Sequence, residues 1–533
     1  MITVKTYKAS NDIESEYSKF TSIEHRKKFA QFFTPFPIAD LMAKWLLGND
    51  QLKDVLEPAF GLGVFSRALL NHREDVNIKG FEIDTNIFEK SKNIFEDHEN
   101  VNLQQSDYMY NDWENKYDGI ICNPPYFKFH DYDNKNILKE IEERTSFKLN
   151  GFTNLYSLFL LKSIYQLSKG GRAAYIIPSE FLNSDYGTLV KSYLIKSKTL
   201  RHIIVVNFEE NVFDDALTTA SIVLCANDNK SEAVQFSNVT NLSDLHKIEG
   251  LIENYPNHLL ATQIVKFENL NPDIKWRAYY QEQNAIKFKH LVSFANYGKV
   301  VRGIATGSNE YFTFNTSKAQ EYKIDAKYLL PCICKAADAK SSFFTKDNFE
   351  ELKANDKFVF LLNAKNPSDE YIKRYIEIGV EQEVNKKFLT ACRNPWYSLE
   401  NRPPSPIWVS VFNRNGLRFI RNEAGLSNLT TFHCIYLNMF SSPKTDLLFA
   451  YLLTDVSRQI FEDNRREYGN GLQKFEPNDI NKAKMLDLEQ VDLDTEKRIL
   501  EYYNLYRQSV LNKTPDENFI SKINDIFIEQ FTL

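Results

Sequence analysis

Residues 53–70, KDVLEPAFGLGVFSRALL, carry the pattern that decides the fold. A short apolar run of strand length ends at Glu57, a turn with Gly61 and Gly63 follows, and a helical segment comes next. The same order of strand, turn and helix recurs as far as about residue 200. Strands that alternate with helices predict a doubly wound α/β fold with a mostly parallel sheet.

The remaining elements of this domain follow the same rhythm. We expect further strands within 77–84, 101–108, 117–126 and 172–181, and two more within 201–227, which gives a seven-stranded sheet. Helices are expected in the first 30 residues, from about Pro37, within 86–97, and over 154–171, where Gly170 and Gly171 would close the helix. Ligands of such sheets bind beyond the carboxyl ends of the strands. Four of those ends carry polar or acidic residues: Glu57, Glu82, Asp107 and Asn123.

Length and composition limit the class of protein. A chain of 533 residues is too long for one ordinary core, so we expect two or three domains. It has no apolar run long enough to span a membrane, and its first ten residues do not resemble a signal peptide. Six scattered cysteines without a CxxC pair favour a reducing cytoplasm and no metal site. The net charge of −6 argues only mildly against a nucleic-acid partner, because local patches decide such binding.

A change in composition near ANDNKSEA, residues 226–233, marks a domain boundary, because beyond it the alternation weakens and aromatic residues become more frequent. We predict a catalytic domain over residues 1–235, a connecting region over 236–284, and a mixed α+β domain over 285–533.

The turn EPAFGLG fits a cofactor site, and the alternative is a simple turn between a strand and a helix. Gly61 and Gly63 let the backbone pass close to a ligand, and Glu82 follows Gly61 by 21 residues, the spacing of a carboxylate that accepts from ribose hydroxyls. Glu82 could equally cap a helix. Position 66 is Ser, so the glycine pattern of nicotinamide enzymes is incomplete. A nucleoside without a pyrophosphate, such as S-adenosylmethionine, fits better.

The tetrapeptide Asn123-Pro124-Pro125-Tyr126 predicts the chemistry. Two prolines hold the backbone extended, so the carbonyls of Asn123 and Pro124 are fixed in direction. Together with the Asn123 side chain they can accept both hydrogens of an exocyclic amine, and Tyr126 offers a ring for a planar base. The alternative, a simple strand stop, explains less of this combination.

These motifs resemble the gamma, or TaqI-like, class of DNA adenine-N6 methyltransferases. The resemblance rests on QFFTP (31–35), LEPAFGLGVF (56–65), FEID (81–84), SDY (106–108) and NPPY (123–126), in that order, and on the segment 154–182. It covers about residues 25–225 closely. It extends more weakly to VVRGIATGSNEYF (300–312) and YGNGLQKFEP (468–477), which resemble parts of that class's target-recognition domains.

The resemblance implies the fold and the site. It implies a class I S-adenosylmethionine-dependent methyltransferase, with a separate target-recognition domain, that methylates adenine-N6 of a flipped-out base in double-stranded DNA beside a separately encoded restriction endonuclease. Cofactor-binding residues would be Thr34, Pro35, Glu57, Ala59, Gly61, Glu82, Asp107 and Tyr108. Catalytic residues would be Asn123, Pro124 and Tyr126, with Phe213 as a second aromatic against the base.

DNA contacts are expected in the C-terminal domain. Residues 384–422 hold seven basic side chains against one acid, Glu400, with aromatic residues between them, and residues 287–302 form another acid-free basic stretch. Basic residues bind phosphates, and arginine also reads guanine edges. The predicted DNA-binding residues are Arg302, Lys386, Lys387, Arg414 and Arg418. The alternative is a solvated charged face.

Four other functions remain open from the sequence. The first is an RNA or protein-glutamine methyltransferase, because the NPPY motif binds a planar amine and does not distinguish adenine from a glutamine amide. The others are a modification subunit that needs a separate specificity subunit, a non-catalytic DNA-binding partner, and a fused nuclease. Only some 30 residues precede the first cofactor motif, and no nuclease-sized segment surrounds the ExK tripeptides 114–116 and 321–323. We therefore expect modification without cleavage.

Overall fold

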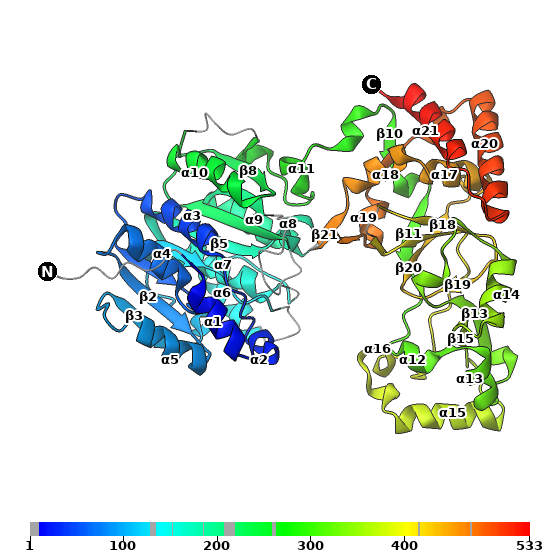
Figure 1. The fold of residues 1–533 in the computed structure, drawn as a ribbon, viewed down its shortest axis with the longest axis horizontal. Coiled ribbons are helices and arrows are strands. Elements are labelled where there is room, and N and C mark those ends of the chain that lie inside the picture. Colours follow the sequence, from blue (N-terminus) through cyan, green and yellow to red (C-terminus); the bar gives the residue numbers. More distant parts are fainter. Residues whose placement is uncertain are drawn as a thin grey trace. The chain divides into compact units, whose positions relative to one another are not determined.

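The structure, a computed structural model, describes residues 10–127, 135–151, 153–184, 186–206, 219–257, 263–413, 416–468 and 472–533. The backbone divides into two compact units (Figure 1). The first comprises Met1–Glu282 and Glu467–Gly471, and the second Gln283–Arg466 and Leu472–Leu533. Residues 236–282 fall within the first of these units.

The first unit is built on one nine-stranded sheet in the order β3-β2-β1-β4-β5-β7-β6-β8-β9. Its strands are β1 (Asp54–Glu57), β2 (Asn77–Glu82), β3 (Val101–Gln105), β4 (Tyr117–Cys122), β5 (Leu167–Pro178), β6 (Leu200–Val206), β7 (Ala220–Ala226), β8 (Ala233–Val239) and β9 (Ile264–Lys266). β7 is antiparallel to β5 and β6, and β9 to β8, while the other pairs are parallel. The seven expected strands are present, and β8 and β9 extend the sheet.

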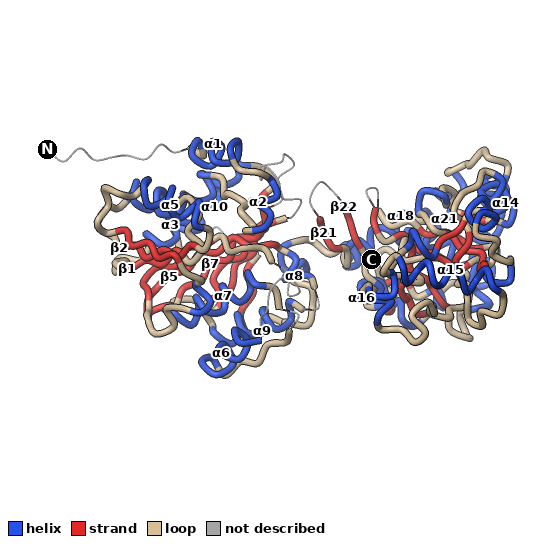
Figure 2. Tube along the Cα trace, turned by 90° about the horizontal axis from the view of Figure 1, so that it is seen from below, coloured by secondary structure: helices blue, strands red, loops and turns tan. Residues whose placement is uncertain are grey.

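Helices cover both faces of this sheet. Figure 2 shows α3, α5 and α10 on one face and α6, α7 and α9 on the other. The helices are α1 (Asp12–Phe20), α2 (Ile23–Lys28), α3 (Phe36–Leu47), α4 (Val64–His72), α5 (Thr85–Ile94), α6 (Lys135–Thr145), α7 (Leu155–Gln166), α8 (Glu180–Asn183), α9 (Gly187–Ser197), α10 (Leu245–Glu253) and α11 (Arg277–Tyr280). Trp45 of α3 is buried against the sheet, and its indole N–H donates to the carbonyl of Ala173 at 3.0 Å.

The turn between β1 and α4 requires glycine. Gly63 has a φ of +70°, and a Cβ atom there would lie 2.5 Å from the Phe95 ring and 2.6 Å from the Phe60 ring. Because L side chains rarely adopt this backbone conformation, Gly63 keeps the turn tight and lets α4 begin at the end of β1.

One expected helix end is wrong. α7 ends at Gln166, and Gly170 and Gly171 lie within β5. Their backbone groups pair with the residue after β7: the Gly170 N–H donates to the Asn227 carbonyl at 2.7 Å, and the Asn227 N–H donates to the Gly171 carbonyl at 2.9 Å. Strand pairing, which is a long-range contact, therefore overrides the glycine stop signal.

The second unit mixes helices with short sheets, as expected. A five-stranded sheet has the order β11-β20-β16-β18-β14, and a four-stranded sheet has the order β12-β15-β13-β19. From residue 283 on, the strands are β10 (Leu291–Ser293), β11 (Gly298–Arg302), β12 (Thr313–Phe314), β13 (Leu329–Ile333), β14 (Phe343–Phe344), β15 (Phe360–Leu362), β16 (Ile407–Ser410), β17 (Phe412–Asn413), β18 (Phe419–Asn422), β19 (Ser427–Asn428), β20 (Phe432–Leu437), β21 (Arg466–Tyr468), β22 (Leu472–Lys474) and β23 (Lys484–Leu486).

The helices of this part of the chain are α12 (Asn309–Phe312), α13 (Thr316–Glu321), α14 (Lys346–Ala354), α15 (Glu370–Glu381), α16 (Phe388–Ala391), α17 (Thr445–Leu452), α18 (Asp455–Glu462), α19 (Pro477–Asn481), α20 (Leu493–Leu511) and α21 (Asn518–Phe531). α17, α18, α20 and α21 pack against the five-stranded sheet around one apolar core. Across the described ranges, no helix is both long and apolar enough to cross a membrane.

Candidate active site

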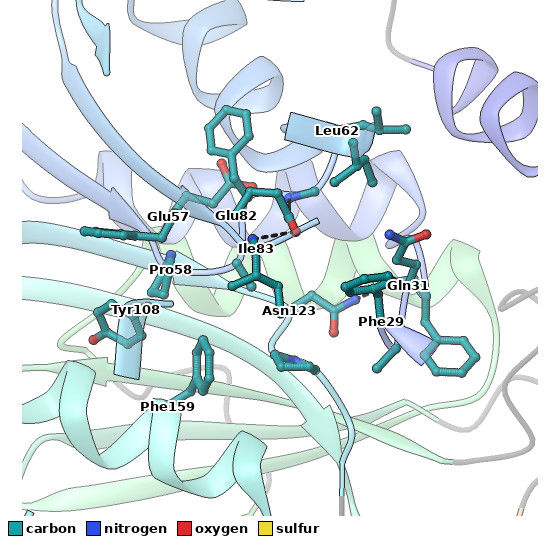
Figure 3. A pocket seen from close by; sticks show the side chains of 18 of the residues that line it. Phe29, Gln31, Glu57, Pro58, Leu62, Glu82, Ile83, Tyr108, Asn123 and Phe159 are labelled. Carbon is teal, nitrogen blue, oxygen red and sulfur yellow. Dashed lines mark hydrogen bonds between the residues drawn. The ribbon is translucent and has the colours of Figure 1, made fainter. Parts of the chain in front are cut away.

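A pocket opens at the carboxyl ends of β1, β2, β3 and β4, where the sequence predicts one (Figure 3). It holds about 890 Å³ of space, including its open mouth, which suits a ligand of nucleoside size. Seven predicted cofactor residues line it: Thr34, Glu57, Ala59, Gly61, Glu82, Asp107 and Tyr108. Asn123 lines it as well, whereas Pro35 begins α3 as its N-cap.

Glu57 is completely buried at the end of β1. Its Oε2 accepts from both the backbone N–H and the hydroxyl of Ser66, at 3.1 and 2.5 Å. Its Oε1 is buried and has no hydrogen-bond partner among the described residues. Burial raises the pKa of the Glu57 carboxyl to about 8, although the Ser66 donors oppose the shift. Because this buried oxygen lies on the wall of the pocket and lacks a protein donor, it can accept a hydrogen bond from a ligand.

Glu82 ends β2 with its carboxylate held by three backbone donors. Oε2 accepts from the Gly61 N–H at 2.9 Å, and Oε1 accepts from the N–H groups of Ile83 and Asp84, each at 2.9 Å. Burial raises its pKa, while these donors act to lower it. The carboxylate therefore faces the pocket in a fixed orientation and caps the turn at the same time. The helix N-cap of α5 is Asp84.

The end of β3 forms a third wall of the pocket. Asp107 accepts from the Met109 N–H at 2.8 Å, and the Ser106 hydroxyl is buried without a partner in the described part of the chain. Tyr108 is 1% exposed, and its hydroxyl donates to Gln166 Oε1 at 2.5 Å. Burial and this hydrogen bond therefore fix the Tyr108 ring in the wall of the pocket.

A buried lysine supports this wall from behind. Lys162 of α7 donates to the carbonyls of Tyr108 and Asn111, and its Nζ lies 3.9 Å from the centroid of the Tyr108 ring. Burial lowers the pKa of Lys162 to about 7, which the charges of Asp112 and Asp107 partly oppose. The sequence does not predict this role of Lys162, because a lysine inside a mostly apolar helix gives no spacing signal.

Asn123 follows β4 and is oriented by the QFFTP segment. Its Nδ2 donates to the Phe32 carbonyl at 2.8 Å and to Thr34 Oγ1 at 3.0 Å. The Phe32 carbonyl only accepts, so the amide nitrogen must face it, and no described residue donates to Oδ1. The geometry therefore leaves the Asn123 carbonyl oxygen as a free acceptor on the wall of the pocket.

Tyr126 is half-buried beside the pocket. Its hydroxyl donates to the Ile176 carbonyl at 3.3 Å, and burial raises its pKa. Its ring lies nearly parallel to Phe32, with 6.0 Å between centroids and 16° between planes. Phe32 is thus a further aromatic residue next to Tyr126, and its position in the QFFTP segment does not by itself predict this contact. Phe213, the predicted second aromatic, lies outside the described residues.

The N-terminal helices fold back onto this site. Gln31 Nε2 donates to Asp84 Oδ2 at 2.5 Å, and His25 Nε2 lies 2.8 Å from the same oxygen. Figure 3 shows Phe29 and Gln31 on the opposite side of the pocket from the strand-end residues Glu57 and Tyr108. Glu14 of α1 also lines the pocket, which its place in a polar helix does not predict.

In the second unit, the structure brings together residues from the two motifs that were expected to belong to a target-recognition domain. Arg302 at the end of β11 pairs with Glu476 at 2.7 Å, and Lys474 contacts the other oxygen of Glu476 at 2.7 Å. Although burial alone would raise it, hydrogen bonds from Lys474 and Arg302 lower the pKa of Glu476 to about 2. Arg302 and the pair Lys474 and Glu476, far apart in sequence, therefore meet in this ion-pair cluster.

The other predicted DNA-binding residues differ in exposure. Lys386 pairs with Glu383 at 2.7 Å, and Lys387 donates to the Ser308 hydroxyl at 2.9 Å, all on exposed surface. Arg418 is half-buried and burial lowers its pKa. Arg414 lies outside the described residues.

Arg393 braces the loop between β11 and α12, donating to the carbonyls of Thr306 at 2.7 Å and Ala305 at 2.5 Å. Because Lys387 meets Ser308 in the same loop, residues 303–308 and 387–393 lie side by side, and the exposed Lys387 and the half-buried Arg393 are the basic residues there. Sequence spacing gave no sign that these two segments meet.

The fold and the pocket together define a class. A strand order of β3-β2-β1-β4-β5-β7-β6 with β7 antiparallel, and a pocket lined by acidic residues at the carboxyl ends of β1 and β2, is the arrangement of class I S-adenosylmethionine-dependent methyltransferases. The predicted fold class is confirmed.

Comparison with known proteins gives the family. Residues 41–213 match the family described as "Eco57I restriction-modification methylase", and residues 275–517 match "Type II methyltransferase M.Eco57I, C-terminal domain". The whole chain is 67% identical to the type II methyltransferase M.AccI of Acinetobacter calcoaceticus, over 99% of that protein. It is 24% identical to M.HindII of Haemophilus influenzae, over 81% of each chain. The chain therefore belongs to the type II DNA methyltransferases of restriction–modification systems, with a C-terminal domain of the M.Eco57I kind.

Two solved structures share the fold. The type IIL restriction–modification enzyme MmeI in complex with DNA superposes with a TM-score of 0.55 at 12% identity, covering 97% of this chain and 74% of MmeI. A nuclease-deletion mutant of the type ISP enzyme LlaGI with a DNA substrate mimic gives a TM-score of 0.53 at 12% identity, covering 93% of this chain and 56% of LlaGI. At this identity the likeness shows the fold alone.

Proposed function

We propose that this type II methyltransferase transfers a methyl group from S-adenosylmethionine to N6 of an adenine that has been flipped out of double-stranded DNA. The observation that carries the proposal is the orientation of Asn123. Its amide nitrogen is held by Phe32 and Thr34, so its carbonyl oxygen is the atom left to accept from a substrate amine.

The pocket residues fit S-adenosylmethionine. This cofactor carries hydrogen-bond donors at its ribose hydroxyls, its adenine amine and its α-ammonium group, and it supplies an electrophilic methyl group when bound. Glu82 would accept from the ribose hydroxyls and Asp107 from the adenine amine. The unpartnered Oε1 of Glu57 would accept from the ammonium group. Thr34, Pro35, Ala59 and Gly61 would shape the methionine end, and Tyr108 would flank the adenine.

The target amine would be held by two oxygens. Asn123 Oδ1 and the Pro124 carbonyl would each accept one amine hydrogen, which moves electron density onto the nitrogen and favours a tetrahedral geometry. Its lone pair would then be free to accept the methyl group that the bound cofactor would supply, and the amine proton would pass to solvent water after the transfer. Preorganised acceptors of this kind stabilise charge that develops in the transition state.

A base inside a duplex does not reach such a pocket, so it has to leave the stack. Stacking on Tyr126, and on Phe213 if it closes the other face, would offset roughly 1–3 kcal/mol of the unstacking cost for each ring. Arg302, Lys386, Lys387, Arg414 and Arg418 remain the proposed DNA contacts of the second unit.

The experiment that tests this function is single-molecule sequencing of DNA from cells that express this chain alone. We expect N6-methyladenine at one short recognition sequence, and no cleavage of that DNA, because we assign cleavage to a separately encoded endonuclease. Methylcytosine in place of methyladenine, or methyladenine without a sequence preference, would contradict the proposal.

A further inference from the structure

Helix α1 is fastened to the cofactor pocket by a side chain that bridges two backbone groups. Asn11, which precedes α1, donates from Nδ2 to the Thr34 carbonyl at 2.9 Å and accepts at Oδ1 from the Phe36 N–H at 2.7 Å. These bonds join α1 to the QFFTP segment that orients Asn123. These two hydrogen bonds therefore hold α1 in a defined position beside the pocket.

Glu14 is the residue that α1 contributes to the pocket. It lines the pocket and is 3% exposed, and its Oε1 pairs with Arg67 of α4, which is 1% exposed. Its Oε2 has a long contact, 3.5 Å from Asn11 Nδ2, and the backbone N–H of Glu14 also acts on the carboxyl group. Arg67 therefore balances the charge of the Glu14 carboxylate through Oε1, while Oε2 can still accept a hydrogen bond from a cationic ligand.

Glu57 provides an independent observation at the same end of the pocket. It is fully buried and lines the pocket, and its Oε1 has no donor among the described residues. Glu14 and Arg67 both act on its pKa, the first raising it and the second lowering it, so the three groups are close enough to interact. Burial raises the pKa of the Cys122 thiol in β4, and the nearby Glu57 carboxyl raises it further. With Glu14 paired to Arg67, Glu57 is the carboxyl group left without a cationic partner, and a bound ammonium group would favour its ionised form.

We propose that Glu14 is a cofactor-binding residue, which together with Glu57 accepts the α-ammonium group of the methionine arm of the cofactor, and that Arg67 is the positioning residue that holds Glu14. The inference rests on the proposed use of S-adenosylmethionine and extends it. It makes helix α1, which precedes the first sequence motif, part of the cofactor site. The resemblance-based assignment of the site begins only at Thr34.

The test compares two ligands that differ only in the amino-acid arm. S-adenosylhomocysteine carries the arm and 5′-methylthioadenosine lacks it, and the full chain is titrated with each by calorimetry. We expect Glu14→Gln to weaken S-adenosylhomocysteine by about tenfold or more, as for loss of a charge-assisted hydrogen bond, and to change 5′-methylthioadenosine by less than about twofold. Glu16→Gln, an exposed change on the same helix, is the matched control and should alter neither affinity.

Glu14→Gln leaves Arg67 buried without its partner, so a second variant is needed. Glu14→Gln with Arg67→Met removes both charges, and thermal unfolding without ligand reports whether each variant is folded. We expect the double variant to show the same loss confined to S-adenosylhomocysteine. Unchanged affinity in both variants, or an equal loss for both ligands, would overturn the role of Glu14. Absence of binding in the unaltered chain would instead reject the proposed cofactor.

Discussion

The side-chain amide of Asn123 donates a hydrogen bond of 3.0 Å to the hydroxyl of Thr34, which lies 89 residues earlier in the chain. The bond links the segment before α3 to the segment after β4. It therefore connects the methionine end of the proposed cofactor site to the residue proposed to hold the target amine. A substitution at Thr34 should therefore disturb the orientation of Asn123 and lower the rate of methyl transfer.

Replacing Thr34 with Val should lower turnover by about tenfold, because Asn123 loses one of its two anchoring acceptors. Asn123→Ala should cost about a hundredfold or more, because an acceptor used in the transition state is removed. Single-turnover rates at saturating cofactor and DNA measure both effects. Cofactor affinity in Asn123→Ala should stay within about threefold of the unaltered chain. If Asn123→Ala turned over at the normal rate, the amine-holding role would be wrong.

Glu82→Ala should weaken S-adenosylmethionine by about 1.5–3 kcal/mol, the scale of a charge-assisted hydrogen bond to the ribose. DNA binding without cofactor should be retained. Calorimetric titration gives the affinity, and Glu89→Gln, an exposed change on α5, is the control. Normal cofactor binding in Glu82→Ala would mean that this carboxylate only caps the backbone of Gly61, Ile83 and Asp84.

Glu57 predicts a pH dependence of stability. Its folded-state pKa is raised to about 8 from 4.5, so the folded protein keeps a proton that the unfolded chain loses between these values. The free energy of unfolding of the ligand-free protein should therefore fall as pH rises from about 5 to 8, with a slope of at most about 1.4 kcal/mol per pH unit from this group. Urea unfolding at several pH values measures the slope.

The control for that slope is Glu57→Gln, which does not ionise and should remove the contribution of this residue. Glu14 and Glu82 have pKa values raised by burial and contribute in the same direction, so the difference between the two proteins is the quantity to compare. Equal slopes in both proteins would show that Glu57 is already ionised in the empty pocket.

Lys386 and Lys387 predict a salt dependence of DNA binding. Changing both to Gln should weaken binding to all sequences and reduce the salt slope by up to about two units, because each phosphate contact contributes about 0.9. A pair of exposed lysines on α14, Lys346 and Lys353, is the matched control. An unchanged slope, measured by titration at several salt concentrations, would place the phosphate contacts elsewhere.

The parts of the fold that local pattern determines were predictable. The strand ends at Glu57, Glu82, Asp107 and Asn123 follow apolar runs, and parallel strands bring their carboxyl ends to one edge, so the structure gathers all four at one pocket.

Contacts between distant segments were not predictable in the same way. Glu14 lies on a polar helix and meets Arg67 53 residues later, which no spacing rule reports. The local sequence at Gly170 and Gly171 predicts the end of a helix, but backbone pairing with Asn227 makes both residues part of a strand. The roles of Phe213 and Arg414 stay predictions.

The measurement that tests the central claim most directly is nucleoside analysis of duplex DNA methylated in vitro by the purified chain with isotopically labelled S-adenosylmethionine. The DNA is digested and its nucleosides are separated by mass, beside a parallel reaction with Asn123→Ala. The account predicts that all label resides in N6-methyldeoxyadenosine and that the variant reduces it about a hundredfold or more. Label in methyldeoxycytidine, or equal label from Asn123→Ala, would contradict it.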